Sequence, residues 1–220
     1  MLMKITTKFV VGAVLAAAAL TAIPAQADEG PFEIRLRAVY LDFAQKSDAI
    51  PVLGLPKDQI EVNKKTIPDI DLEYFFTKNI STELVLTYPQ SQTVSVKGVG
   101  DLGTFKHLPP TLTAKWNFIP DGFFRPYVGV GVNLTFISNV NLKVPAAISP
   151  TEADIPLDLS STSVGFAGQI GADFKIVDHW FANIDVKYVQ LGSDVKAGGA
   201  TVTKVHLDPW LIGAGVGYRF

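Results

Sequence analysis

The sequence contains no cysteine, only three histidines and almost no net charge. Without cysteine the chain has no disulfide framework, no thiolate metal site and no thiol nucleophile. A formal charge of −2 at pH 7 offers no basic field for nucleic acid, so we expect no nucleic-acid partner. The histidines, His107, His179 and His206, are too scattered to match a metal-site spacing. We therefore expect neither a metal nor any other cofactor.

The same scarcity of histidine argues against catalysis. Hydrolytic chemistry needs a nucleophile, a base and an orienting group within reach of one another. His107 with Asp208 or a loop serine could form a dyad, but nothing in their spacing requires one. A histidine in a loop or at the rim of the fold is the simpler interpretation. We expect a protein that is not an enzyme.

Long hydrophobic runs are missing beyond the N-terminus. The apolar run FVVGAVLAAAALTAI, residues 9–23, follows Lys4 and Lys8 and precedes Ala25-Gln26-Ala27. A membrane-spanning helix needs about 20 apolar residues, so this run is short for an anchor. A positive segment, an apolar segment and a small-x-small site together predict a secretory signal peptide. We expect residues 1–27 to be a cleaved signal peptide and residues 28–220 to be exported from a bacterial cytoplasm.

In place of long runs, the rest of the chain alternates between apolar and polar residues with a period of two. The connections between the alternating segments are short and long in turn, with long loops expected at about 43–65, 90–107, 139–161 and 192–203. This order is typical of an up-and-down barrel with tight turns at one end and loops at the other. The eight segments lie at 32–42, 66–76, 80–89, 108–118, 125–138, 162–176, 180–191 and 204–220.

The two faces of these segments differ sharply in charge. Even positions, such as Leu36, Val130 and Ile184, are nearly all uncharged, whereas odd positions carry the charges. Successive side chains of a strand point to opposite faces, so one face of each strand is apolar. A soluble barrel with its apolar face inward is the alternative. Aromatic residues at the ends of the apolar face oppose it, because they form girdles in membrane barrels. These are Phe32, Tyr40, Phe76, Tyr88, Phe118, Phe136, Trp180, Tyr188, Trp210 and Phe220.

The segments are also longer than most soluble strands, and about 9–11 tilted residues cross a bilayer. We therefore expect an all-β fold, an eight-stranded antiparallel up-and-down transmembrane β-barrel. Tyr218 and Phe220 would lie in its inner aromatic girdle.

The inward charges predict a polar plug. Eight strands leave an interior about wide enough for side chains, and buried charges persist only when they are paired. Acids and bases on the inward face are nearly balanced, which suits a paired network in the periplasmic half of the lumen. The predicted plug residues are Arg35, Arg37, Asp71, Glu73, Glu83, Lys115, Asp173, Lys175, Asp185, Lys187 and Arg219, with Glu33 and Arg125 on the same face.

The outer half of the inward face is apolar instead. We expect its residues to line a hydrophobic channel, a funnel above the plug, although simple packing of the barrel explains them equally well. An apolar solute that entered such a funnel would leave sideways more easily than through the charges below. The predicted lining residues are Val39, Leu41, Val85, Ile137, Val189, Leu191, Val205 and Leu207.

Prolines mark a weak place in the predicted wall. Pro89 lies at the end of the third segment, and Pro109 and Pro110 lie at the start of the fourth. Proline has no N–H and cannot donate to the strand ladder. We expect a lateral exit between these two segments. The alternative is that the prolines only end strands and shape loops.

Three stretches, HLPPTLTAKW, FRPYVGVGVN and LDPWLIGAGVGYRF, closely resemble the outer membrane protein W (OmpW) family, which includes the alkane-uptake protein AlkL. The resemblance covers essentially the whole chain after the signal peptide. It implies an eight-stranded barrel in the bacterial outer membrane and the passage of small hydrophobic molecules through a channel that opens sideways. It also implies that the terminal aromatic is recognised by the outer-membrane assembly machinery.

Two functions remain open. The first is passive transport of small hydrophobic solutes across the lipopolysaccharide layer into the outer-membrane lipid, for which a monomer is sufficient. The second is a structural or surface-interaction barrel, with a receptor or stress-related role for its loops and no significant transport.

Overall fold

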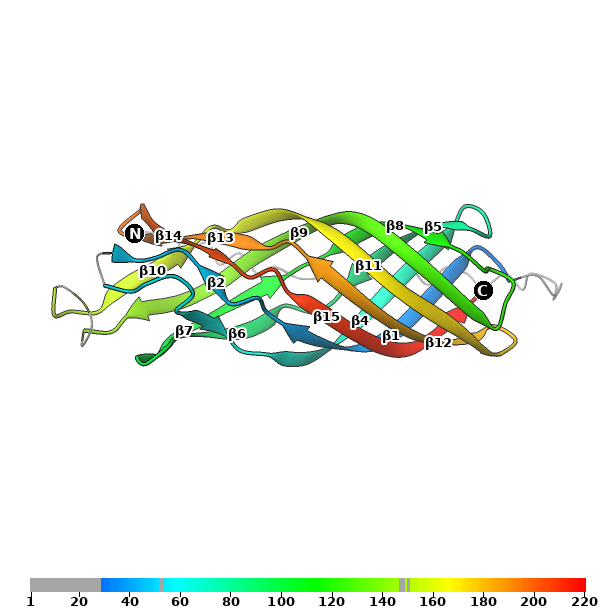
Figure 1. Ribbon diagram of the computed structural model, residues 1–220, viewed down its shortest axis with the longest axis horizontal. Helices are drawn as coiled ribbons and strands as arrows, with labels where there is room; N and C mark the ends of the chain where they lie inside the picture. The colour runs from blue at the N-terminus through cyan, green and yellow to red at the C-terminus, as the bar shows by residue number, and fades with distance from the viewer. Residues whose placement is uncertain (1–28, 52–53, 147–148, 150) are drawn as a thin grey trace, which may run out of the picture.

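The computed structural model describes residues 29–51, 54–146, 149 and 151–220. The described residues form fifteen antiparallel strands that close into one elongated barrel (Figure 1). We call the half that contains the C-terminus, at the right in Figure 1, the lower half of the barrel. There eight strands surround the lumen in the order β1, β4, β5, β8, β9, β11, β12 and β15, and β15 pairs with β1 to close the wall. This confirms the predicted eight-stranded antiparallel barrel. The expected signal peptide lies outside the described residues and stays a prediction.

Several wall strands are interrupted and continue beyond a short break. β1 (Phe32–Asp42) and β4 (Lys65–Phe75) are followed by β5 (Ile80–Leu86), which continues as β6 (Gln90–Val96). β7 (Gly100–Leu108) returns and continues as β8 (Thr111–Asn117). The remaining wall strands are β9 (Phe124–Val144), β11 (Thr162–Val177), β12 (Trp180–Val189), β13 (Gly192–Ala197), β14 (Ala200–His206) and β15 (Trp210–Arg219). The short strands β2 (Lys46–Ser47), β3 (Ile60–Val62) and β10 (Ile155–Leu159) lie at the outer end.

The prediction of long loops at 90–107, 139–161 and 192–203 is largely wrong, because strands occupy most of these ranges. β6 and β7 form a hairpin across the first of these ranges, β9 extends to Val144 and β10 covers part of the second, and β13 and β14 form a hairpin across the third. These extensions alternate in the opposite sense from the membrane segments. Their outward side chains are mostly polar and their inward side chains are mostly apolar, as expected where water rather than lipid surrounds the wall.

At two places along the wall, the residues that face inward change from odd-numbered to even-numbered. Odd residues such as Glu83 and Val85 face inward in β5, but even residues such as Val94 and Val96 face inward in β6, after Pro89. Within β9 the change occurs at Asn139, whose φ is 49°. An extra residue in one strand shifts its side chains to the other face.

The outer surface of the lower barrel is apolar, as predicted. Leu36, Val130 and Ile184 are all more than half exposed. Aromatic rings meet in pairs across strands at both ends of this belt: Trp180 and Tyr218 at 5.0 Å, and Tyr188 and Trp210 at 5.2 Å between centroids. Such girdles mark the two membrane interfaces of a barrel. No helix among the described residues is long and apolar enough to cross a membrane.

Candidate functional site

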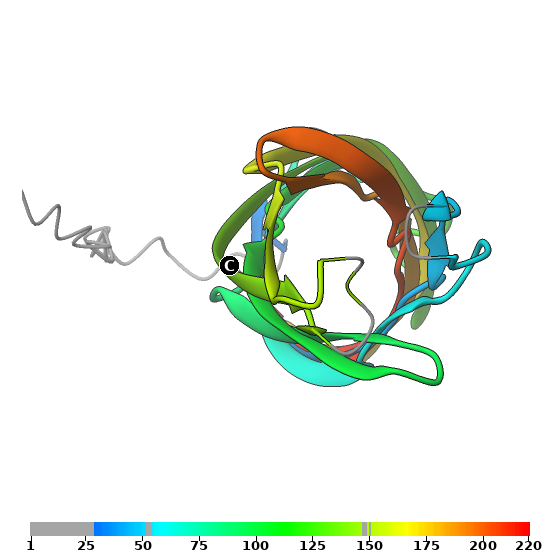
Figure 2. The ribbon, with the colours of Figure 1, turned by 90° about the vertical axis from the view of Figure 1, so that its left-hand side faces the viewer.

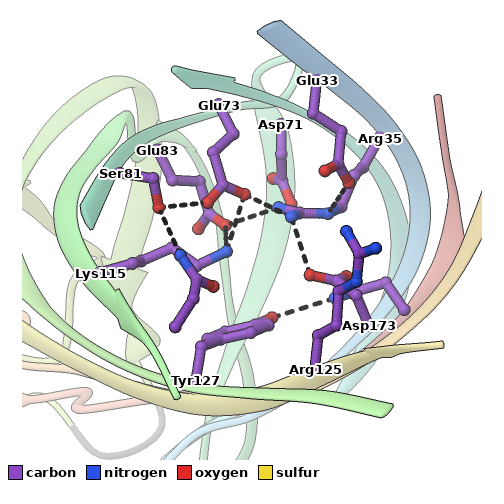
Figure 3. A network of polar contacts seen from close by, with 12 residues as sticks. Glu33, Arg35, Asp71, Glu73, Ser81, Glu83, Lys115, Arg125, Tyr127 and Asp173 are labelled. Atoms are coloured by element: carbon purple, nitrogen blue, oxygen red, sulfur yellow. Dashed lines mark hydrogen bonds and ion pairs between the residues drawn. The ribbon is translucent and has the colours of Figure 1, made fainter. Parts of the chain in front are cut away.

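A network of buried charges fills the lower lumen, and Arg35 is at its centre (Figure 3). Its side chain is fully buried and contacts four carboxylates from four different strands. Nε lies 2.8 Å from Glu33, Nη1 lies 3.0 Å from Glu83, and Nη2 lies 3.2 Å from Asp173 and also contacts Glu73. One guanidinium therefore ties together strands from opposite sides of the barrel.

The other buried cations extend this network. Arg37 pairs with Asp69, Asp71 and Asp185 at 2.8, 2.8 and 2.9 Å. Lys115 lies 2.8 Å from Glu73 and 3.1 Å from Glu83, and Lys187 lies 3.0 Å from Glu83. We call this network the plug. All eleven predicted plug residues lie on the lumen side, but Lys175 is partly exposed at the periplasmic end.

Glycines of β15 make room for the plug. An added Cβ at Gly213 would lie 2.5 Å from Asp185 Oδ1, and one at Gly217 would lie 2.6 Å from Glu33 Oε1. At Gly215 the same atom would lie 2.1 Å from the backbone oxygen of Leu36. The glycines on the inward parity of the last strand are therefore explained by the space that the charged side chains and the neighbouring backbone occupy.

Sequence reasoning missed two acids of the lower lumen. Asp69 bonds Arg37 through both of its oxygens, and its odd position in β4 was a usable signal. Glu29 precedes β1 and binds Arg125 at 2.5 and 2.8 Å and Lys175 at 2.7 Å. Burial alone would raise the pKa of the Glu29 carboxyl, but the hydrogen bonds and charges of Arg125 and Lys175 lower that pKa to about 2. Glu29 lies outside the alternating segments, so periodicity could not reveal it.

Above the plug, the extracellular half of the barrel encloses an apolar cavity of about 200 Å³, which we call the chamber. Figure 2 looks along the barrel from this end. Strands β3, β6, β7, β9, β10, β13 and β14 supply its walls, and Ser193 is the one polar residue among the described residues that line it. Ile137, Val205 and Leu207 line the chamber as predicted funnel residues. Most of the remaining lining, including Val94 and Leu142, lies in segments that were predicted to be loops.

A smaller cavity of about 30 Å³, the waist, separates the chamber from the plug. The other five predicted funnel residues, Val39, Leu41, Val85, Val189 and Leu191, line it. Its polar lining comes from the upper plug, which contributes Arg37, Asp69, Asp185 and Lys187, and from the wall, which contributes Thr87, His107, Thr111 and Asn133. The lumen therefore changes from apolar to fully charged across the waist.

The strand ladder is interrupted beside the waist. Pairing of β5 with β8 ends at Val85 and Thr111, and pairing of β6 with β7 begins at Gln90 and His107. Among the backbone hydrogen bonds of the described residues, none joins 87–89 to 108–110. We call this interruption the wall break. Of the predicted exit residues, Pro109 lines the waist, Pro89 is exposed on the outer surface and Pro110 is half-buried.

Side chains supply several of the hydrogen bonds beside the wall break, although the backbone oxygen of Pro110 also accepts from Leu134 N at 3.0 Å. Thr87 Oγ1 donates to the oxygen of Pro68 at 2.9 Å, and Thr111 Oγ1 donates to that of Pro109 at 3.2 Å. Asn133 Nδ2 donates to the oxygens of Pro109 and Pro110, both at 3.2 Å. These bonds depend on rotatable side chains, so the wall here is held less rigidly than by a strand ladder.

A second interruption on the opposite wall is bridged by backbone. There Leu207 N donates to Leu191 O at 2.7 Å, and Val189 N donates to Pro209 O at 3.1 Å. Asp208 Oδ1 accepts from Leu191 N at 2.9 Å. The break between β5–β6 and β7–β8 is thus the more weakly paired of the two, even though both contain proline.

Two of the histidines lie in different surroundings. His107 is buried beside Gln92, with its Nε2 3.2 Å from Gln92 Nε2, and Asp208 is engaged with the backbone of Leu191 instead. His206 is exposed on the outer surface of β14. Within the described ranges no three His, Asp or Glu side chains are grouped so that they could hold a metal ion.

Comparison with known proteins assigns the chain to a family. A sequence model of the OmpW family matches residues 28–220. An uncharacterized outer-membrane protein, y4mB of Sinorhizobium fredii, is 38% identical over 93% of this chain and 90% of its own length. Outer membrane protein W of Vibrio cholerae is 34% identical, over 92% of this chain and 95% of its own length. The crystal structure of OprG from Pseudomonas aeruginosa superposes with a TM-score of 0.72 at 27% identity, covering 87% of this chain and 97% of that one. The chain therefore belongs to the OmpW family and is a β-barrel of the bacterial outer membrane.

Proposed function

We propose that the barrel gives small hydrophobic molecules passive access to the outer membrane, through the chamber and then sideways through the wall break. The observation that carries this proposal is the position of the apolar chamber above the charged plug, with only the small waist between them. An apolar solute gains free energy on leaving water for the chamber, at roughly 25 cal/mol per Å² of buried apolar surface. Continuing downward would require it to separate buried ion pairs, each break of which costs about 3–5 kcal/mol. The lipid beside the waist is the favourable destination.

Whole-cell uptake tests the transport function. Cells that carry the protein in the outer membrane are expected to take up decane several-fold faster than cells that lack it. The purified barrel in a planar bilayer is expected to show no large stable conductance, because the plug fills the lower lumen. Equal uptake by both cell types would favour the surface-interaction role, in which deletion of the outer hairpins changes adhesion or phage sensitivity instead. A large stable conductance would contradict a filled lumen.

The wall break offers a separate test of the lateral route. Replacing both Pro89 and Pro110 by Thr restores two backbone donors and allows the ladder to extend across the break. We expect decane uptake to fall by about two- to fivefold while the amount of protein in the membrane is unchanged. Pro156→Thr is the matched control, because Pro156 is an exposed residue of β10, which pairs with β9 and β13 and with none of the four strands beside the break. If the double variant took up decane as fast as the wild type, the solute would not leave the barrel through the wall break.

A further inference from the structure

Asp71 is a fully buried acid of the plug, and neither of its two oxygens makes a hydrogen bond. Its side chain points from β4 into the lumen, among the charged groups of the network (Figure 3). Among the described acids of the plug it alone has both oxygens in this state, since Glu33 and Asp185 have one such oxygen each. Burial of an unpaired polar atom is costly, and burial of an unpaired charge costs more. The state of this carboxyl group therefore calls for an explanation.

The one cation that pairs with Asp71 in the described part of the chain is already engaged by another acid. Arg37 Nε lies 2.8 Å from Asp71 Oδ2, but this nitrogen has a single hydrogen, which it donates to Asp69 Oδ1 at 3.0 Å. Arg37 Nη2 donates to Asp69 Oδ2 at 2.8 Å. Arg37 Nη1 makes no hydrogen bond and lies 2.9 Å from Asp185 Oδ1. The guanidinium thus binds Asp69 through two parallel bonds and gives Asp71 only the contact of its charge.

The other groups around Asp71 do not supply the missing partner. The charges that act on it are those of Glu83, Arg37, Lys187 and Asp69. Lys187 Nζ is bound to Glu83 at 3.0 Å and pairs with no second acid among the described residues. On the neighbouring strands, Asp71 is opposite Arg35, which four other carboxylates occupy, and opposite the apolar Val85.

The charges of the lower lumen also leave one carboxylate unmatched. The ion pairs of the plug join four cations to seven carboxylates, an excess of three acids. The cations are Arg35, Arg37, Lys115 and Lys187, and the carboxylates are Glu33, Asp69, Asp71, Glu73, Glu83, Asp173 and Asp185. At the periplasmic end three cations surround the single carboxylate of Glu29, which reduces the excess from three to one.

We propose that Asp71 is a proton-binding site, and that its carboxyl group is protonated in the folded barrel at neutral pH. The proton removes the one negative charge that the cations of the described lumen do not match. It also gives Asp71 an O–H donor in a space that is rich in carboxylate acceptors. This property does not depend on the transport function proposed above, because it concerns the charge balance that holds the plug together.

A proton held at Asp71 makes the barrel less stable as the pH rises. In the unfolded chain an aspartate is ionised above about pH 4, so unfolding at neutral pH releases this proton. The stabilisation is complete below that pH and is lost progressively, until the pH at which the folded barrel itself loses the proton. Over this range the single proton raises the equilibrium constant for unfolding by about tenfold per pH unit.

The substitution Asp71→Asn tests the site, because asparagine has the shape of a protonated aspartate and carries no charge. Urea titrations of both barrels in lipid vesicles, between about pH 5 and about pH 8, give the equilibrium constants for unfolding. We expect the ratio of the wild-type constant to the Asp71→Asn constant to rise by about tenfold per pH unit. Asp173→Asn is the matched control, because Arg35 and Asn183 bind this acid directly. It should be less stable than wild type at every pH and keep the wild-type pH dependence.

Two results of the titrations would overturn the proposal. One is a ratio that does not change with pH, and the other is an Asp71→Asn barrel that is destabilised at neutral pH as much as Asp173→Asn. Infrared spectra of barrels with ¹³C in the aspartate carboxyl groups detect the proton directly. At neutral pH the wild type is expected to show the C=O stretch of a protonated acid, lost in Asp71→Asn and kept in Asp173→Asn. If the wild type lacks this band, Asp71 is ionised and the proposal is wrong, whether or not the variants fold.

Discussion

Replacing Arg35 by Met is expected to lower the free energy of unfolding of the barrel by about 3–5 kcal/mol, the usual cost of removing one partner from a buried ion pair. The guanidinium is fully buried, and its loss leaves Glu33, Glu73, Glu83 and Asp173 with less compensating charge. Methionine is flexible and of similar length, so the effect reports the charge more than the packing. Urea titration of the barrel in lipid vesicles, followed by the shift between folded and unfolded bands on gels, measures it.

Two further variants test whether the loss of stability in Arg35→Met comes from the buried charges or from any substitution in the barrel. Arg35→Met combined with Glu73→Gln removes one of the carboxylates and should recover part of the lost stability. Lys64→Met breaks the ion pair with Asp42 at 2.9 Å, which is exposed to water, and should leave the urea midpoint unchanged. If Lys64→Met were as harmful as Arg35→Met, the stability of the barrel would not depend on the buried network.

Strand parity predicted the lower half of the barrel well because two constraints act there together. Hydrocarbon excludes charges from the outer face, as at Leu36 and Ile184, and a narrow lumen gathers those charges inside, as at Arg35 and Asp185. An apolar outer face alone, or a charged inner face alone, would have made the alternation of residues along each strand weaker. Their agreement over eight strands left one consistent fold.

The extracellular half was predicted poorly because neither constraint applies to it. Water surrounds β6, β13 and β14, so serine, threonine and lysine face outward and the segments read as polar loops. The parity changes after Pro89 and at Asn139 then place Val94 and Leu142 on the inward face out of step with the strand below. Most of the chamber lining therefore escaped sequence reasoning.

The wall break was located from its prolines, but its difference from the second break could not be. Pro209 also interrupts a strand, yet its backbone oxygen accepts from Val189 and the neighbouring residues pair across the gap. Which oxygens find backbone partners and which rely on Thr87, Thr111 and Asn133 depends on the register of the neighbouring strands.

Placing a carboxylate in the chamber is expected to reduce decane uptake at least about tenfold. Val205 of β14 is 6% exposed and lines the chamber, so Val205→Asp introduces an ionisable group where the described lining offers no cation. Its hydration shell would occupy the apolar space, and an apolar solute would have to displace that water at a cost of a few kcal/mol. Uptake at equal amounts of folded protein in the membrane is the measurement.

The adjacent residue provides the control, because His206 points to the outer surface of the same strand. His206→Asp also introduces an aspartate into β14 but leaves the chamber apolar, so its uptake should match wild type. Val205→Asn, polar but uncharged, should give an intermediate rate. If Val205→Asp carried decane as fast as wild type while remaining folded, the apolar residues above the plug would serve only to pack the outer barrel. The solute would then have to reach the lipid by a path that avoids the chamber.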